Sequence, residues 1–401
     1  MTSGGTDAGK TEAGKTDAGV ASGALTGRGT FADLGGWPGV LGRIMSGESL
    51  AEHEAAAVIG AVLDGAATPA QTAALLVALR MKGESVEEMT GLVKAMLAHA
   101  VPLRIDGDVV DVVGTGGDRL SSINVSTLAA CIAAGAGARV CKHGNRAASS
   151  SVGTADVLEA LGVEVSLGPR GVARCVEEAG MGFCFAPRYH PAMRHAAPVR
   201  PELGVPTVLN FLGPLANPAR ARRQLVGVSD PEMAPKMAEV LGANGSLHAM
   251  VVHADDGLDE LSVTSPSSVT EVVAAPDAPG GYLLSSFRLD PESLGVARSS
   301  MRELRGGDAA YNAGVIRHVL EGERSARRDI GVLNAAAALV VAGRAEGIAD
   351  AMVQASDALD SGRALAVLEG LVRVSREEAD AERAAGAQPL DGGSGLPSAA
   401  T

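Results

Sequence analysis

Between residues 41 and 100, hydrophobic residues recur with the period of an α-helix in three successive segments. Polar capping residues precede each segment, and glycine follows the first two, as expected where helices begin and end. The helix starts and ends are marked by Ser49 with Glu52 and then Gly65, by Thr68-Pro69 with Gln71 and then Lys82-Gly83, and by Ser85 with Glu88. This region is therefore predicted to be a compact helical unit, which could also supply a dimer interface.

After Pro102 the pattern changes to short β-branched runs that alternate with helical segments. The predicted strands are 109–113, 138–141, 163–165, 225–228 and 250–252, and the predicted helices include 154–161, 169–179, 231–241 and 308–320. Such alternation is typical of a mostly parallel sheet covered by helices. The fold class expected is α/β, with a small all-helical N-terminal domain and a larger α/β domain. Ligands of such folds bind at the carboxyl ends of the strands.

The chain divides into four parts by composition. Residues 1–37 contain the near-repeat TDAGK, TEAGK, TDAGV and are expected to be a disordered extension, as is the tail 383–401. Residues 38–104 form the helical domain, joined by part of 190–218, and 105–382 form the α/β domain.

Composition excludes several classes of protein. A net charge of −13 and only 2% aromatic residues argue against a nucleic-acid-binding protein. The chain has no apolar stretch long enough to span a membrane and no secretory signal, so a cytoplasmic location is expected. The cysteines form no CxxC pair and are predicted to be reduced, structural thiols; they are Cys131, Cys141, Cys175 and Cys184.

A glycine-rich turn, Gly114-Thr115-Gly116-Gly117-Asp118, follows the first predicted strand. It does not fit a dinucleotide-binding fingerprint, because Arg119 stands at the sixth position, and it lacks the Gly-Lys-Ser/Thr of a P-loop. Its glycines nevertheless allow consecutive N–H groups to face an anion. The segment Asn124-Val125-Ser126-Thr127 then opens an apolar helix, where a cap and an anion site can coincide.

Three further segments carry candidate chemistry. Lys142-His143-Gly144-Asn145-Arg146 ends the second strand and leads into a serine-rich loop that enters a helix at Thr154. The stretch 190–218 places His190, Arg194 and Arg200 in polar surroundings, where an arginine can meet a carboxylate. Asp255-Asp256-Gly257-Leu258-Asp259-Glu260 does not fit an EF-hand. Near a bound diphosphate, its adjacent acids predict a Mg²⁺ site.

Taken together, these segments resemble anthranilate phosphoribosyltransferases. The matching text is DVVGTGGD, NVST, KHGNRAASS, the run HPAMRHAAPVRPELGVPTVLNFLGPLANPA and VVHADDGLDE, in the family's order over roughly residues 38–382. The resemblance implies transfer of phosphoribose from 5-phosphoribosyl 1-diphosphate (PRPP) to the amine of anthranilate. It also implies two Mg²⁺ ions per subunit, a homodimer formed through the helical domain, and a helical domain hinged on an α/β domain.

The resemblance also implies roles for individual residues. PRPP would be bound by Gly114, Gly117, Asp118, Ser122, Asn124, Val125, Ser126, Thr127, Lys142, His143, Gly144, Asn145, Arg146, Ser149, Ser150 and Thr154. Anthranilate would be bound by Gly114, Asn145 and Arg200, with His143 and His190 lining its approach. The magnesium ligands would be Ser126, Asp259 and Glu260. No side chain is expected to act as a general base, because the aniline nitrogen is already a neutral nucleophile.

Two alternatives stay open at this point. A pyrimidine nucleoside phosphorylase has a similar fold and a glycine-rich phosphate loop, but it needs neither adjacent metal-binding acids nor Arg200. A non-catalytic nucleic-acid-binding relative would need a broad basic face, which the net charge disfavours.

Overall fold

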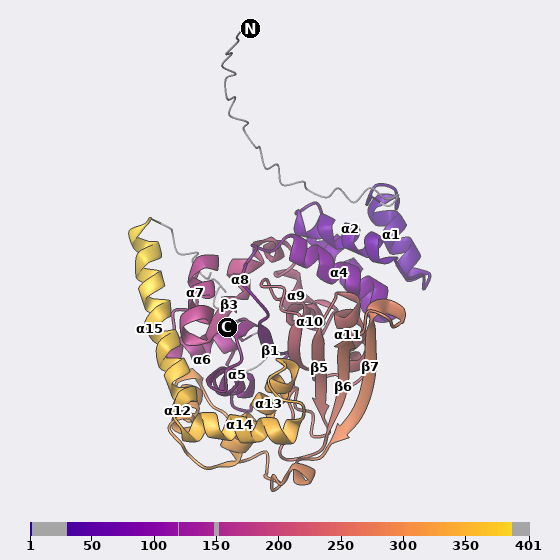
Figure 1. The fold of residues 1–401 in the computed structure, drawn as a ribbon. Coiled ribbons are helices and arrows are strands. Elements are labelled where there is room, and N and C mark those ends of the chain that lie inside the picture. Colours follow the sequence, from indigo (N-terminus) through magenta and orange to yellow (C-terminus); the bar gives the residue numbers. More distant parts are fainter. Residues whose placement is uncertain (2–29, 119, 148–151, 387–401) are drawn as a thin grey trace, which may run out of the picture.

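The structure, a computed structural model, describes Met1 and residues 30–118, 120–147 and 152–386. The first helices lie together at one end of a larger body built on a central sheet (Figure 1). Most of the expected N-terminal extension and C-terminal tail lies outside the described residues, as do Ser149 and Ser150. Among the residues described, no helix is both long and apolar enough to cross a membrane.

The N-terminal helices are α1 (Gly36–Met45), α2 (Glu52–Leu63), α3 (Pro69–Lys82) and α4 (Val86–Ala98). Two predicted capping boxes are confirmed. The Gln71 N–H donates to Thr68 Oγ1 at 3.2 Å while the Thr68 N–H donates to Gln71 Oε1 at 2.9 Å, and Ser85 and Glu88 make the same exchange.

The box predicted from Ser49 and Glu52 is wrong. Helix α2 begins at Glu52, and the carboxylate of Glu54 accepts the Ala51 N–H at 2.8 Å. Alanine has no side-chain acceptor, so only this half of a capping box is formed, two residues further on. Helix α1 was not predicted, and it begins at Gly36, inside the expected extension.

The sheet has seven strands in the order β3-β2-β1-β4-β5-β6-β7. Strands β1 to β5 pair in parallel, whereas β6 and β7 are antiparallel. The strands are β1 (Val110–Gly114), β2 (Val140–Gly144), β3 (Met181–Phe185), β4 (Arg223–Gly227), β5 (His248–Ala254), β6 (Ser267–Ala274) and β7 (Tyr282–Leu289). The mostly parallel central sheet is confirmed, and four of the five predicted strands overlap an observed one.

The strand predicted at 163–165 is wrong. Val163 and Val165 are buried, but the Glu164 N–H donates to the side chain of Ser375 at 3.0 Å instead of joining the sheet. The third strand on this side is β3, and neither it nor the antiparallel pair β6–β7 was predicted. At 163–165, apolar β-branched residues therefore indicate that the segment is buried, not that it pairs with another strand.

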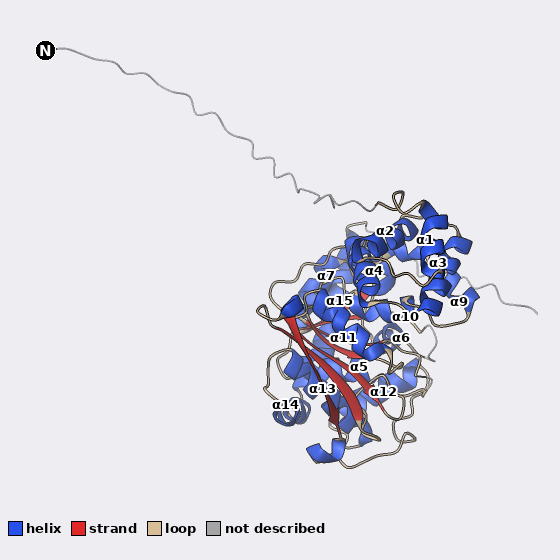
Figure 2. Cartoon of the chain, turned by 90° about the vertical axis from the view of Figure 1, so that its right-hand side faces the viewer, coloured by secondary structure: helices blue, strands red, loops and turns tan. Residues whose placement is uncertain are grey.

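Helices cover both faces of the sheet, and Figure 2 shows them on either side of the strands. Val110 and Val112 of β1 belong to one hydrophobic core, while Val113 faces the other, as expected for alternating side chains. The first core includes residues of α5, α7, α13, α14 and α15, and the second includes α11 and the N-terminal helices.

The remaining helices are α5 (Val125–Gly135), α6 (Thr154–Ala160), α7 (Pro169–Ala179), α8 (Ala186–Tyr189), α9 (Val199–Leu203), α10 (Leu209–Leu212), α11 (Met233–Ala243), α12 (Ala309–Leu320), α13 (Ala326–Val341), α14 (Ile348–Asp360) and α15 (Arg363–Ala384). Short 3₁₀ turns are η1 (Pro191–His195), η2 (Gly213–Leu215), η3 (Pro279–Gly281) and η4 (Pro291–Leu294).

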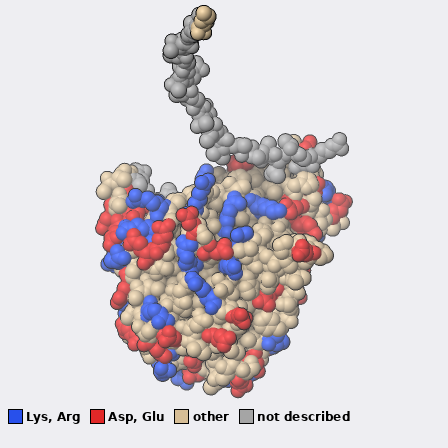
Figure 3. All heavy atoms as spheres, in the orientation of Figure 1, with Lys and Arg blue, Asp and Glu red and all other residues tan. Residues whose placement is uncertain are grey.

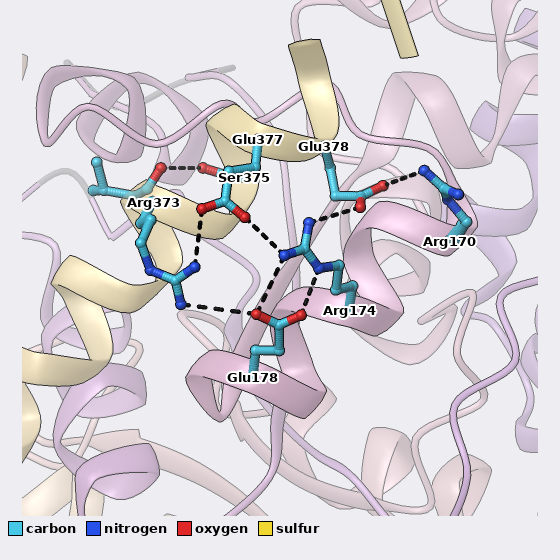
Figure 4. A network of polar contacts seen from close by, with 8 residues as sticks. Arg170, Arg174, Glu178, Arg373, Ser375, Glu377 and Glu378 are labelled. Carbon is cyan, nitrogen blue, oxygen red and sulfur yellow. Dashed lines mark hydrogen bonds and ion pairs between the residues drawn. The ribbon is translucent and has the colours of Figure 1, made fainter. Parts of the chain in front are cut away.

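A network of charged side chains fastens the C-terminal helix α15 to α7 (Figure 4). Arg174 pairs with Glu178 on its own helix, and with Glu377 at 2.7 Å and Glu378 at 2.9 Å on α15. Arg170 reaches Glu378 at 3.0 Å, and Arg373 pairs with Glu377, also at 3.0 Å. Each charge in this network is therefore compensated within the chain.

Candidate active site

The glycine-rich turn and the acidic segment, far apart in sequence, meet where β1 and β4 end. The Gly116 N–H donates to Asp259 Oδ2 at 2.7 Å. A Cβ on Gly114 would lie 2.4 Å from the same oxygen, so only glycine admits the carboxylate there. Gly116 and Gly117 have φ of +67° and +84°, a backbone region that favours glycine. The turn is thus shaped to accept Asp259 and to expose amide groups.

A glycine is also required at position 227, at the end of β4, and the sequence analysis did not identify it. A Cβ at this position would lie 1.5 Å from the carbonyl oxygen of Asp259. Gly114 and Gly227 are paired in register on adjacent parallel strands. Two glycines side by side therefore let the segment with Asp259 and Glu260 cross the sheet edge. The only signal in the sequence for this requirement is a single glycine near the end of a predicted strand.

Three acidic side chains gather at this edge and repel one another. Burial, followed by the nearby charge of Asp118, raises the pKa of Asp259 to about 6. Burial and Asp259 raise the pKa of Glu260, and burial raises that of Asp118. Glu260 accepts a hydrogen bond from the Ser126 N–H at the start of α5. Such a concentration of buried carboxylates is a poor arrangement for stability and a good one for a cation.

Lys142 lies beside these acids and is almost fully buried. Its Nζ donates to Ser126 Oγ at 3.0 Å and to the Val112 carbonyl. Burial lowers the pKa of Lys142, whereas the charges of Asp111 and Glu260 act to raise it. The pocket therefore combines several carboxylates, which suit a cation, with one ammonium group, which suits an anion.

His143 presents one ring nitrogen without a partner. Its Nδ1 lies 3.2 Å from the Gly213 carbonyl, which can only accept, so Nδ1 carries the proton. Its Nε2 is buried and has no hydrogen-bond partner among the described residues. Burial and the neighbouring His190 lower the pKa of His143 to about 3, so the ring is neutral. Nε2 is therefore a hydrogen-bond acceptor.

The predicted site residue His190 lies behind His143, not in the pocket wall. The two ring centroids are 5.2 Å apart, and His190 Nε2 donates to the Ala216 carbonyl at 2.9 Å. Thr127 is likewise fully buried and does not line the pocket. In the sequence, both residues stand close to others that do line the pocket. Neighbouring side chains point in different directions, so sequence position alone could not show that these two do not line it.

A buried hydrogen-bond hub positions this part of the wall. Asp111 Oδ1 accepts the His143 N–H at 3.0 Å, and Asp111 Oδ2 accepts from Asn217 Nδ2 at 2.8 Å. Asn217 also donates to the Cys141 carbonyl at 2.8 Å. Asp111 and Asn217 were not predicted as site residues, although both stand within segments that carry the resemblance. They tie β1 and β2 to the loop that begins at Gly213.

Arg200 supplies an uncompensated positive charge to the same pocket. It lies on α9, is half-buried, and makes no ion pair among the residues that the structure describes. Burial lowers its pKa from the usual value. Arg194, by contrast, is exposed and donates to the Pro191 carbonyl. Figure 3 shows Lys and Arg side chains gathered over α8 and α9 despite the net charge of −13.

These elements enclose a cavity of about 280 Å³. The predicted residues in its wall are Gly114, Gly117, Asp118, Ser122, Asn124, Val125, Ser126, Lys142, His143, Gly144, Asn145, Arg146, Thr154, Arg200, Asp259 and Glu260. Lining residues that were not predicted include Asn210, Gly213 and Pro214. Asn312, from α12, was also missed: its Nδ2 donates to Asn124 Oδ1 at 2.9 Å and so orients a lining residue.

Comparison with known proteins finds two family models on the chain. Residues 38–100 match the helical bundle domain of a glycosyl transferase family, and residues 106–365 match its α/β domain. The anthranilate phosphoribosyltransferase of Thermomicrobium roseum is 52% identical over 345 residues, covering 86% of this chain and 98% of that protein.

Solved structures are similar over the same extent. The anthranilate phosphoribosyltransferase of Thermus thermophilus is 42% identical, with a TM-score of 0.78 over 84% of this chain and 99% of that one. The enzyme of Saccharomyces cerevisiae, in complex with PRPP and Mg, is 25% identical, with a TM-score of 0.76 over 85% of this chain and 98% of that one.

Proposed function

This chain belongs to the anthranilate phosphoribosyltransferase family, and we propose that its cavity at the ends of β1, β2 and β4 holds both substrates at once. The enzyme transfers the phosphoribosyl group of PRPP to the amine of anthranilate. The products are N-(5-phosphoribosyl)anthranilate and diphosphate, in the second step from chorismate to tryptophan. It uses Mg²⁺.

The donor's diphosphate is held by amides and cations at the strand ends. Gly117 in the turn, the first residues of α5 and Lys142 all line the cavity. Backbone amides at a helix start and in a glycine turn favour an anion. As the bond between ribose C1 and the diphosphate oxygen breaks, these donors stabilise the charge that develops on the leaving group.

The residues also fit the magnesium ions. Asp259 and Glu260 lie together with raised pKa values, and Ser126 lies beside them. The described residues include no group of three or more His, Cys, Asp or Glu side chains placed to hold a metal. Mg²⁺ typically takes one or two carboxylates and completes its shell with water and substrate phosphates. Bound there, two ions per subunit would neutralise diphosphate charge.

Arg200 provides a positive charge that can bind the acceptor substrate, anthranilate. Its guanidinium, half-buried and without an acid partner among the described residues, would pair with the anthranilate carboxylate. Asn145, Gly114 and the neutral His143 line the same cavity, and the unpartnered Nε2 of His143 would accept an amine hydrogen if the ligand reaches it. His190 would then act through His143. Positioning and electrostatics carry this reaction, without a general base.

The observation that carries this assignment is the placement of the unpaired Arg200 and the acidic pair in one cavity. The test is the loss of anthranilate fluorescence with and without PRPP and Mg²⁺. We expect loss only when both are present. Phosphorolysis of thymidine without activity on anthranilate would instead favour the nucleoside phosphorylase alternative.

A homodimer formed through the helical domain is supported by exposed apolar side chains there. Met45 at the end of α1 and Met81 on α3 are 78% and 83% exposed, and these two helices pack together. Val205, just after α9, is also exposed, and α9 packs against α3, as the grouping in Figure 2 shows. Large exposed apolar residues that cluster in this way mark interaction surfaces.

Sedimentation equilibrium tests the dimer. The wild-type chain should sediment as a dimer, and Met81→Glu should shift it toward monomer because a charge would be buried in the interface. Val353→Glu, at another exposed apolar residue, is the matched control and should leave the mass unchanged. A wild-type monomer at micromolar concentration would contradict the proposal.

A further inference from the structure

A second cavity, of about 200 Å³, lies at the other end of β4 from the substrate cavity. Gly227 ends β4 beside Asp259, whereas the second cavity is lined by Gln224 near the start of the strand. The rest of its wall comes from α4, from η2 and the loop after it, and from the C-terminal end of α11 with the residues that follow. Nothing in the reaction uses this cavity.

Two buried side chains in its wall have unused polar atoms. Ser246 is 6% exposed, and its hydroxyl makes no hydrogen bond to any described residue. Gln224 is 3% exposed; its Nε2 donates to the Pro214 carbonyl at 3.0 Å, and its Oε1 accepts from no described residue. Neither oxygen is itself fully buried, so each can hydrogen-bond to water in the cavity or to a ligand that replaces that water.

Arg220 stands at the mouth of the cavity in a strained conformation. Its φ is +52°, and Ser121 is the other non-glycine residue with positive φ in the described chain. For an L-residue such a conformation is costly, and strain of this kind collects at functional sites. The guanidinium of Arg220 has no acid partner among the residues described, and the nearest acid to Arg222 is Asp108 at 3.6 Å. No carboxylate lines the cavity.

The inner wall is apolar. Leu97 from α4, Leu215 from η2 and Leu241 from α11 line it together with Ala221. A bare anion would leave these side chains without contacts, and a purely apolar ligand would leave the arginines and Ser246 unpaired. The cavity is smaller than the substrate cavity, about 200 Å³ against about 280 Å³, so its occupant is expected to be smaller than the two substrates together.

We propose that this cavity is a binding site for a small carboxylic acid with an apolar body. The carboxylate pairs with Arg220 at the mouth, the apolar body lies against the leucines, and Ser246 with Gln224 hydrogen-bonds a polar substituent.

The loop from Gly213 to Arg222 lines both cavities. Gly213 and Pro214 contact the substrate cavity, while Asn217 and Arg220 contact the second one. Asn217 also holds Asp111, which in turn holds the backbone of His143. A ligand in the second cavity therefore sits on the loop that positions the substrate wall.

The test uses 4-bromobenzoate as the probe, because its bromine can be located by anomalous scattering in crystals of the full-length enzyme. Calorimetry then compares the wild type with Arg220→Asn, Arg200→Ala and Arg344→Asn. Asparagine tolerates positive φ, so Arg220→Asn removes the charge while keeping the turn. Arg344 is an exposed arginine outside both cavities and serves as the matched control.

We expect bromine density in the second cavity and an affinity that Arg220→Asn lowers about tenfold or more, the effect of a lost charge-assisted hydrogen bond. Arg344→Asn should leave binding unchanged, and Arg200→Ala should remove only binding of the probe in the substrate cavity. The proposal is overturned if the bromine lies only in the substrate cavity and binding depends on Arg200. It is also overturned if density appears without measurable binding in solution, or if inorganic phosphate binds as tightly as the probe.

Discussion

The α7–α15 surface and the substrate cavity use charged residues in opposite ways. At the surface, Arg174 alone contacts three glutamates, and Figure 4 shows arginines and glutamates alternating so that every charge has a partner. In the cavity, Asp259 and Glu260 are buried beside one another, and Arg200 has no acid partner among the described residues.

The difference separates structural from functional charge. Exposed ion pairs contribute little each, and Glu378, the buried acid of the network, keeps a second arginine when one is lost. Buried carboxylates that repel one another destabilise the empty fold, so their presence is explained by a ligand of opposite charge. The shifted pKa values of the cavity acids therefore point to function, whereas the α15 network points to helix anchoring.

The largest expected effect comes from removing the acids of the cavity. Asp259→Asn with Glu260→Gln should abolish Mg²⁺-dependent turnover, with a loss of roughly 10²–10³-fold or more in kcat, because electrostatic stabilisation of the leaving diphosphate is lost. Circular dichroism should show an intact fold. Glu377→Gln, which removes one acid of the surface network, is the control and should keep wild-type turnover. Unchanged magnesium dependence in the double variant would contradict the site.

Arg200→Ala should raise the KM for anthranilate by roughly 10–100-fold, since a charge-assisted hydrogen bond contributes about 1.5–3 kcal/mol. The KM for PRPP should change little, because the diphosphate of this donor is proposed to bind beside the glycine-rich turn and Lys142, not at Arg200. Arg194→Ala, the exposed neighbour, is the matched control. Equal increases in both KM values would remove Arg200 from the anthranilate subsite.

Magnesium binding should depend on pH in a defined direction. The pKa of Asp259 is about 6 in the metal-free cavity, so below that pH the carboxyl is protonated and a cation must displace the proton. The apparent affinity for Mg²⁺ should rise with pH through the pKa of Asp259, by at most about tenfold per unit for each proton displaced, and should level off only once Glu260, whose pKa is also raised, is ionised. Calorimetry across this range in wild type and Asp259→Asn checks it; an affinity that falls as pH rises would refute the assignment.

The smallest effect is expected at the surface network. Arg174→Ala should lower the Tm slightly while leaving kcat and both KM values unchanged. Its partners Glu178 and Glu377 stay solvated, and the buried Glu378 keeps its ion pair with Arg170. Differential scanning fluorimetry and steady-state kinetics measure the two quantities. A variant with intact Tm but altered KM would mean that α15 communicates with the cavity.

Features that depend on neighbouring residues were predictable. The capping exchanges of Thr68 with Gln71 and of Ser85 with Glu88 follow from spacing alone, as does the turn at Gly116 and Gly117, where positive φ requires glycine. The strand–helix alternation was sufficient to predict the mostly parallel sheet. The motifs marked most of the residues that line the substrate cavity.

Features that depend on distant partners were not predictable in the same way. Val163 and Val165 look like a strand but are buried beneath α15, because hydrophobic burial and strand pairing favour the same residue types. His190 and Arg200 stand in one motif, yet one supports the wall and the other forms it. Asn312 reaches Asn124 across 188 positions, with no local signal.

By itself, the sequence determined the local backbone: where helices begin, where glycine frees the chain, and which strand ends carry polar side chains. These follow from interactions over a few residues, which short spacings record. Only the tertiary structure decided which charges stay unpaired and which side chains share a cavity. Those properties depend on residues more than a hundred positions apart, such as Gly114 with Gly227 and Gly114 with Asp259, whose contacts exist only once the sheet has formed.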